Sequence, residues 1–333
     1  MQAVTGEGDG DAAASMGLDV LTICGTYAAL TAAHTTGLLK LAMGQLLAPV
    51  QYAQSLGLEE RTTATVLQVL AAAGLLERHG ELYGVPAQTP TATGVSLAWL
   101  PMLQEHFAHT LVALRTGRTL DWLDSSVGQR ESSYRDLVAG LGTAYAKAAE
   151  ALAAHIDGQP ERILDVGCGS GVWSLAIAAR HPAAHVTGLD LPAVLDAFVA
   201  RARQNELHQR IAPLAGDMHS VALPAEHFDL IVIANVLRLE APERAAQLVA
   251  RLAGALRRGG RLLIVDALAG GTPLKELVRA AYALHLSLRT GHGRVHSAAQ
   301  IAAWTAAAGL TDTAEIDCGS QMTAIGALLS RKP

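Results

Sequence analysis

The sequence predicts an α/β domain with a mostly parallel sheet, preceded by a mainly helical N-terminal part. From residue 162 onward, short apolar segments of strand length alternate with helix-length segments, which is the pattern of a parallel sheet with crossover helices. Before residue 158, helix-length segments dominate. Half of the 333 residues are apolar, and this length favours two domains over one.

The N-terminal part divides into three predicted segments. Residues 1–15 are rich in glycine and acidic residues and are expected to form a disordered tail. Residues 16–95 are expected to form a winged-helix-like domain. In it, a helix over 18–41, interrupted near Gly37, and a helix over 59–73 precede two strands joined by a turn at His79-Gly80. Residues 96–157 are expected to be connecting helices, over 97–116 and 132–156, that line a substrate pocket.

The charges of the winged-helix-like segment argue against DNA binding. Residues 50–85 carry four glutamates against two arginines, whereas a helix that reads a DNA groove needs several cations to neutralise phosphates. The net charge of −5 likewise gives no general attraction to nucleic acid or to an anionic membrane. We therefore expect this segment to be a protein–protein surface that forms a homodimer. A regulator that binds DNA and senses a ligand is the alternative.

Composition also indicates whether the chain spans a membrane, whether it binds a metal ion and in which compartment it is expected. Residues 20–39 carry no formal charge, but their threonines, histidine and glycines favour a packing or dimer helix over a membrane span. The three cysteines, Cys24, Cys168 and Cys318, are scattered and suit neither a disulfide framework nor a zinc site. We therefore expect a cytoplasmic protein without a bound metal.

A glycine-rich turn between a strand and a helix is the most informative motif. Residues 162–164 form a predicted buried strand that ends at Asp165, and the turn Gly167-x-Gly169-x-Gly171 leads into a helix that stops at Pro182. Such a turn lets a ligand lie against bare backbone. The spacing matches neither the dinucleotide fingerprint nor the phosphate-binding P-loop. The motif predicts a cofactor cradle of another kind.

Polar residues follow the predicted strands of residues 158–333. Further strands are expected over 185–190, 210–215, 228–234 and 261–266, with closing antiparallel strands over 313–316 and 323–329. The residues at or just after the first four strand ends are Asp165, Asp190, Asp217 and Asn235. Ligands of open α/β sheets bind beyond the carboxyl ends of the strands. Asp190 lies nineteen residues after Gly171, where an acid can chelate two ribose hydroxyls.

The motif Asp165-x-Gly-x-Gly-x-Gly171, with Gly188-Leu-Asp-Leu-Pro192 and Ala215-Gly-Asp-Met218, resembles that of class I S-adenosylmethionine-dependent methyltransferases. Together with the N-terminal segment, it is similar to the family of plant caffeate-type and bacterial antibiotic O-methyltransferases. The resemblance implies a Rossmann-like sheet with an antiparallel edge and a winged-helix dimerisation domain. It implies S-adenosyl-L-methionine as cofactor and a hydroxylated small molecule of secondary metabolism, aromatic ones included, as acceptor substrate.

The resemblance also assigns cofactor contacts by position. Asp165, Gly167 and Gly169 would face the methionine part of the cofactor. Asp190 would bind the ribose, with Leu191 beside it. The set is completed by Asp217 at the adenine amino group, Met218 on the ring face, and Asn235.

One departure from the family concerns the catalytic base. The family typically carries Leu-His-Asp-Trp after the fourth strand, and its histidine deprotonates a phenol. Arg238 occupies the histidine position here, and arginine stays protonated and cannot accept a proton. Arg238 could hold an ionised substrate by its oxyanion or carboxylate. Alternatively, it forms a salt bridge with Glu240 or Glu243.

Other groups could stand in for the missing base. His285 lies on the helix that usually lines the substrate pocket, and His292 and His296 lie in the following loop. His106 and His109, by contrast, are expected on a partly solvated helix face. We predict Arg238 and His285 as the residues that face the acceptor. A C- or N-methyltransferase, or a relative that uses the cofactor for non-methylating chemistry, is the alternative.

Overall fold

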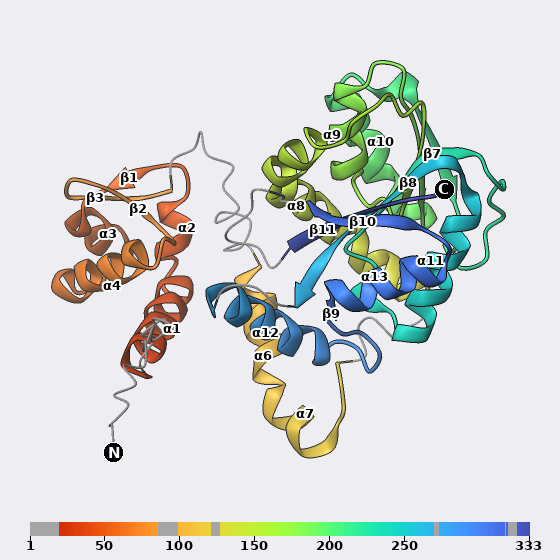
Figure 1. Ribbon diagram of the computed structural model, residues 1–333. Coiled ribbons are helices and arrows are strands. Elements are labelled where there is room, and N and C mark those ends of the chain that lie inside the picture. The colour runs from red at the N-terminus through yellow and green to blue at the C-terminus, as the bar shows by residue number, and fades with distance from the viewer. Residues whose placement is uncertain (1–19, 86–98, 121–126, 270–272, 317, 319–324) are drawn as a thin grey trace, which may run out of the picture. The chain divides into compact units, whose positions relative to one another are not determined.

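The computed structural model describes residues 20–85, 99–120, 127–269, 273–316, 318 and 325–333 (Figure 1). The chain forms two compact units, Met1–Thr89 and Pro90–Pro333. The predicted winged-helix-like segment corresponds to most of the first unit. The predicted connecting helices and ligand-binding domain fall in the second. The predicted tail, residues 1–15, lies outside the described residues.

The first unit combines helices with a small antiparallel sheet. Its helices are α1 (Val20–Thr35), α2 (Leu38–Ala42), α3 (Pro49–Leu56) and α4 (Glu60–Ala72). Gly37, with φ of 80°, interrupts the helical conformation between α1 and α2, as predicted. The strands β1 (Leu46–Leu47), β2 (Glu77–His79) and β3 (Leu82–Gly84) pair in the order β1-β3-β2. The β2–β3 hairpin confirms the predicted turn at His79-Gly80.

Side chains from the helices and the sheet form the core of the first unit. Tyr52 on α3 is fully buried and donates its hydroxyl hydrogen to the carbonyl of Tyr83 on β3, at 2.8 Å. Leu67 and Leu70 on α4 are also fully buried. Glu59 caps the start of α4 by accepting from the backbone N–H groups of Arg61 and Thr62.

The second unit is built on a mostly parallel sheet, and this confirms the predicted fold class. Neighbouring strands run in the order β10-β11-β8-β7-β4-β5-β6, and the five from β8 to β6 are parallel. β11 and β10 form the predicted antiparallel edge, and short β9 pairs with β8. The strands are β4 (Arg162–Val166), β5 (His185–Asp190), β6 (Ile211–Ala215), β7 (Phe228–Ala234), β8 (Leu256–Ala269), β9 (His296–Ser297), β10 (Thr311–Ile316) and β11 (Ile325–Arg331).

Helices cover both faces of this sheet (Figure 1). Alternation along the strands sends successive side chains to opposite faces, so Ile163 packs with Trp173 and Phe198 while Leu164 packs with the other layer. One layer is α8 (Val127–Ala153), α9 (Val172–Arg180) and α10 (Leu195–Gln204), and the other is α11 (Pro242–Ala255) and α13 (Ala298–Ala307). Ser297 caps the start of α13, because its hydroxyl accepts from the Gln300 N–H.

The helices α6 (Leu100–Ala108), α7 (Thr110–Thr116) and α12 (Pro273–Ser287) complete the unit. The single helix predicted over 97–116 is therefore wrong. The His109 N–H turns to the carbonyl three residues back, at His106, and α6 ends there. α8 begins at Val127, earlier than the predicted residue 132. No helix of the described chain is long and apolar enough to cross a membrane.

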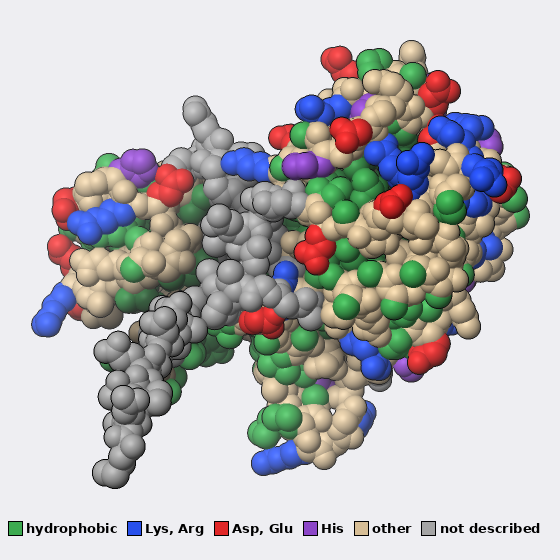
Figure 2. Space-filling view, viewed as in Figure 1, with side chains coloured by type: hydrophobic (Ala, Val, Ile, Leu, Met, Phe, Trp, Pro, Cys, Tyr) green, Lys and Arg blue, Asp and Glu red, His purple; other side chains and the backbone are tan. Residues whose placement is uncertain are grey.

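Lysines and arginines gather near the C-terminal end of the chain, with acidic side chains among them (Figure 2). Arg162 and Arg257 both pair with Asp229, and Lys332 pairs with Glu226 at 3.5 Å. These cations are partly neutralised within the protein, which disfavours this surface as a site for a polyanion.

Candidate active site

A cavity of about 450 Å³ lies beyond the carboxyl ends of the parallel strands. This volume is in the range of small-molecule sites. The glycine turn, the strand ends and α8 all contribute to its lining. The structure brings together all eight predicted cofactor-binding residues around it: Asp165, Gly167, Gly169, Asp190, Leu191, Asp217, Met218 and Asn235.

The glycine turn is held in a backbone conformation that requires glycine. Gly167 and Gly171 have φ of 65° and 70°, in the left-handed region. A Cβ at Gly167 would lie 2.6 Å from Val236, and one at Gly171 would lie 2.5 Å from Phe198. The N–H groups of Gly167 and Cys168 both donate to the carbonyl of Leu189, which ties the turn to β5.

Two backbone donors fix the carboxylate of Asp190 at the end of β5. One oxygen accepts from the Gly169 N–H at 2.8 Å, and the other accepts from the Leu191 N–H at 2.7 Å. A carboxylate oxygen carries more than one lone pair and can accept more than one hydrogen bond. The side chain is thus held between the glycine turn and the cavity, where it can accept hydrogen bonds from a diol.

Asp165 is fully buried at the end of β4. The Ser174 hydroxyl on α9 donates to its carboxylate at 2.5 Å. Burial raises the pKa of Asp165 to about 7. The Ser174 hydrogen bond lowers the pKa, and the charge of Asp190 raises it by a smaller amount, so burial decides the direction. A cation in the cavity would favour the ionised form of this carboxyl.

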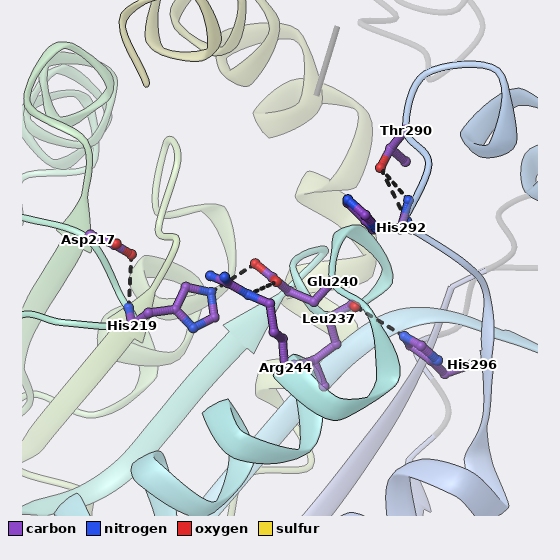
Figure 3. A network of polar contacts seen from close by, with 9 residues as sticks. Asp217, His219, Leu237, Glu240, Arg244, Thr290, His292 and His296 are labelled. Carbon is purple, nitrogen blue, oxygen red and sulfur yellow. Dashed lines mark hydrogen bonds and ion pairs between the residues drawn. The ribbon is translucent and has the colours of Figure 1, made fainter. Parts of the chain in front are cut away.

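A polar network forms the wall of the cavity between the ends of β6 and β7 (Figure 3). Asp217 accepts from the backbone N–H of His219, and the His219 ring bonds to Glu240 at 2.9 Å. Glu240 also accepts from Arg244 at 3.0 Å. Burial raises the pKa of Glu240, but the contacts with His219 and Arg244 outweigh it, so the net shift is downward. Glu240 is therefore an ionised, doubly bound carboxylate.

Arg238 lies in a short 3₁₀ turn, Leu237–Leu239, directly after β7. It is 7% exposed and does not line the cavity itself. Its Nη1 donates to Asn235 Oδ1 at 2.6 Å and to Asp266 Oδ1 at 3.2 Å, and its backbone N–H donates to Asp266 Oδ2. The predicted salt bridge to Glu240 or Glu243 is wrong, because Asp266 on β8 pairs with Arg238 while Glu240 bonds to His219 and Arg244.

His285 on α12 is buried against a second imidazole. Its Nε2 lies 2.8 Å from Nδ1 of His106 on α6, and the two rings stack. Burial lowers the pKa of His285 to about 3, with added contributions from Arg289 and His106. His285 is therefore neutral at neutral pH. The expectation of a solvated His106 is wrong, because α12 packs against α6 and buries it to 6% exposure.

The two loop histidines occupy different environments (Figure 3). His292 is exposed, and its backbone N–H donates to the Thr290 hydroxyl. His296 is buried, with one ring nitrogen 3.1 Å from the carbonyl of Leu237. Neither lines the cavity. Among the described residues, no group of three or more potential ligands could hold a metal ion.

Comparison with known proteins identifies the family. The family model of the O-methyltransferase domain matches residues 143–311, which is half of the chain. The chain belongs to the O-methyltransferase family. It is a methyltransferase that uses S-adenosyl-L-methionine as its cofactor.

Relatives that match over most of the chain agree with this assignment. Acetylserotonin O-methyltransferase of Mus musculus molossinus is 28% identical over 78% of this chain and 74% of its own. The 3-hydroxy-5-methyl-1-naphthoate 3-O-methyltransferase of Streptomyces sahachiroi is 27% identical over 85% of each chain. Among solved structures, the S-adenosylmethionine-dependent methyltransferase SibL is 25% identical over 94% of this chain and 98% of its own, with a TM-score of 0.70.

Proposed function

We propose that this O-methyltransferase acts on a hydroxyl group of an aromatic secondary metabolite. The cavity bordered by the Asp190 and Asp217 carboxylates and the glycine turn supports the cofactor half of the proposal, and the names of two relatives support the acceptor half. The relative from Streptomyces sahachiroi is named for a hydroxylated naphthoate. A second relative, TcmO of Streptomyces glaucescens, is named for tetracenomycin polyketide synthesis and is 26% identical over 85% of this chain.

We assign the cofactor contacts to the residues that line the cavity. Asp190, held by two backbone donors, would accept the ribose hydroxyls, with Leu191 beside them. Asp217 would accept from the adenine amino group, and Met218 would pack on the ring. Asp165, Gly167 and Gly169 would border the methionine part, and Asn235 would contact it from the acceptor end of the site. The bound cofactor supplies an electrophilic methyl group, which an aligned acceptor oxygen attacks in line.

We propose positioning roles for Arg238 and His285 rather than proton transfer. Arg238 carries no lone pair and is fixed by Asp266 and Asn235. His285 has a pKa of about 3, which makes it a weak base. The Tyr282 ring lies 4.9 Å from the Arg238 guanidinium and 6.4 Å from the His285 ring, and so connects the two. We place the acceptor next to the part of the cavity wall that lies against Arg238, Tyr282 and His285.

Calorimetry with S-adenosylmethionine tests the cofactor site. Replacing Asp190 by Ala is expected to weaken binding at least tenfold, because the diol loses its charged acceptor. Replacing Asp312, an exposed carboxyl on β10, by Asn serves as the control and should leave affinity unchanged. Equal affinity of wild type and Asp190→Ala would contradict the assignment. Detection of S-adenosylhomocysteine together with a methylated product would exclude non-methylating chemistry.

We also propose that the chain is a homodimer in the cytoplasm. The first unit carries exposed apolar side chains on α1, which supports an interface there: Val20, Leu21, Ile23 and Tyr27. Light scattering should give twice the mass of the chain, and Leu21→Glu should lower it. A monomeric wild type would contradict the proposal. The three free cysteines, of which Cys168 and Cys318 are buried, support a reducing compartment.

A further inference from the structure

The acceptor end of the cavity is organised around the buried guanidinium of Arg238. This cation donates to Asn235 and lies close enough to Tyr145 to lower the pKa of its hydroxyl, and both residues line the cavity. The Asp266 carboxylate, which is 2% exposed, pairs with the Arg238 guanidinium and compensates its charge. The Tyr282 ring lies against the guanidinium at 4.9 Å. The chemistry offered to an acceptor is therefore set by how Arg238 orients its two neighbours.

Arg238 fixes which atoms Asn235 presents. A guanidinium has five N–H donors and no acceptor, so its 2.6 Å partner on Asn235 is the amide oxygen. The amide NH₂ is then turned away from Arg238. Asn235 itself is held in the left-handed region, with φ of 62°, and its backbone N–H donates to the carbonyl of Val265. The strained backbone and the two hydrogen bonds make Asn235 a fixed donor at the cavity wall.

Arg238 also determines the hydrogen-bonding role that is left to the Tyr145 hydroxyl. The charge of Arg238 lies close enough to Tyr145 to lower its pKa, and a guanidinium has no acceptor, so the hydroxyl hydrogen of Tyr145 cannot be donated to Arg238 and is left to donate elsewhere. Burial raises the pKa of Tyr145, and the nearby charge of Arg238 reduces this shift without reversing it. Tyr145 is therefore protonated at neutral pH. Its ring packs at 5.8 Å from that of Trp173, another cavity residue, which holds the hydroxyl in place.

The carboxylate paired with Arg238 is already engaged in hydrogen bonds and is not offered to an acceptor as a base. The Asp266 carboxylate accepts from the Arg238 side chain, the Arg238 backbone and the Ala267 N–H. Arg238 is a cation, and burial raises the pKa of Tyr145, so neither of these two groups is an anion at neutral pH. A neutral hydroxyl in this place would meet two donors and would still need an acceptor for its own proton. An oxyanion would satisfy both donors.

We propose that the acceptor binds as a phenolate, so that the substrates are phenols acidic enough to lose their proton to solvent before methylation. This inference rests on the proposed function and names its substrate class. Tyr145 and the Asn235 amide hold the oxyanion, and Arg238 positions both. The phenolate oxygen forms the new bond to the methyl carbon while the methyl–sulfur bond breaks and its electron pair stays on sulfur. No residue receives a proton in this step.

The ionisation of bound 4-nitrophenol tests the proposal directly. This phenol ionises near neutral pH, and its phenolate absorbs visible light. We expect the dye bound to the protein with S-adenosylhomocysteine to titrate at least one pKa unit lower than in water. Tyr145→Phe should reduce that shift by about one unit, because a hydrogen bond to a charged group is lost. The control Tyr27→Phe, on exposed α1, should keep the full shift.

Turnover gives a second readout. Wild type should methylate 4-nitrophenol at least tenfold faster than 4-methylphenol, which is similar in size but ionises near the pKa of tyrosine, about 10. A bound dye with an unchanged or raised pKa, or no saturable binding of the dye, would overturn the proposal. Calorimetry with S-adenosylhomocysteine on the same sample distinguishes a failure of the proposed substrate class from a failure of the proposed function. If the nucleoside binds and the dye is not held as the phenolate, the substrate class fails while the proposed function stands.

Discussion

Replacing the buried Asp165 by Asn is expected to stabilise the ligand-free protein while weakening cofactor binding. The pKa of this carboxyl is about 7 in the folded protein, against 3.8 without burial. Between these values the folded protein holds a proton that the unfolded chain has released. Stability therefore falls as the pH rises through this window and is constant above it. At about 1.36 kcal/mol per pKa unit, the raised pKa of Asp165 lowers stability by about 4 kcal/mol at pH 8, where the carboxyl is ionised, and by about 2 kcal/mol at pH 5.5, where the folded protein holds the proton.

Asparagine is neutral at every pH and keeps an oxygen that can accept from the Ser174 hydroxyl. Urea unfolding of Asp165→Asn and wild type at both pH values measures the difference. We expect the gain in unfolding free energy of the variant over wild type to be larger at pH 8 than at pH 5.5. Asp312→Asn is the matched control, since Asp312 is exposed on β10. A variant with no gain in stability, or a gain that does not change with pH, would refute the reasoning.

Three further outcomes follow from the same geometry. Wild type should bind S-adenosylmethionine about tenfold more tightly at pH 7.5 than at pH 5.5 by calorimetry, because the cation favours ionised Asp165, and equal affinities would count against this. Asp266→Asn should destabilise the fold by about 3–5 kcal/mol in urea, since it leaves the Arg238 charge buried without its partner. Gly167→Ala should cost about 2–4 kcal/mol, because alanine disfavours the left-handed backbone and its Cβ would meet Val236 at 2.6 Å. A thermal melt unchanged from wild type would contradict either stability prediction.

The cofactor end of the site could be predicted from the sequence because it is local. Asp165 and the glycine turn lie within seven residues, and Asp190 and Asp217 each follow a strand whose apolar pattern is plain. The carboxyl-end rule for parallel strands then brings them to one edge. The same rule applies to Asp266, which the sequence places at the end of the predicted fifth strand. Applying it there would have identified the partner of Arg238.

The acceptor end could not be predicted in this way because it depends on contacts between distant segments. The hydrogen bond of His106 with His285 spans 179 residues and requires α6 to lie against α12. Tyr145 reaches the cavity only through the packing of α8, and nothing in its local sequence distinguishes it from a core tyrosine. The contact of His219 with Glu240 joins two loops, and each residue alone would be read as a solvated side chain.

The structure of the chain with S-adenosylhomocysteine tests the central claim most directly. We predict the ribose hydroxyls within hydrogen-bonding distance of the Asp190 carboxylate, the adenine amino group at Asp217, and the sulfur directed toward Tyr145 and Asn235. A nucleoside bound outside this cavity, or one whose ribose lies away from Asp190, would contradict the account.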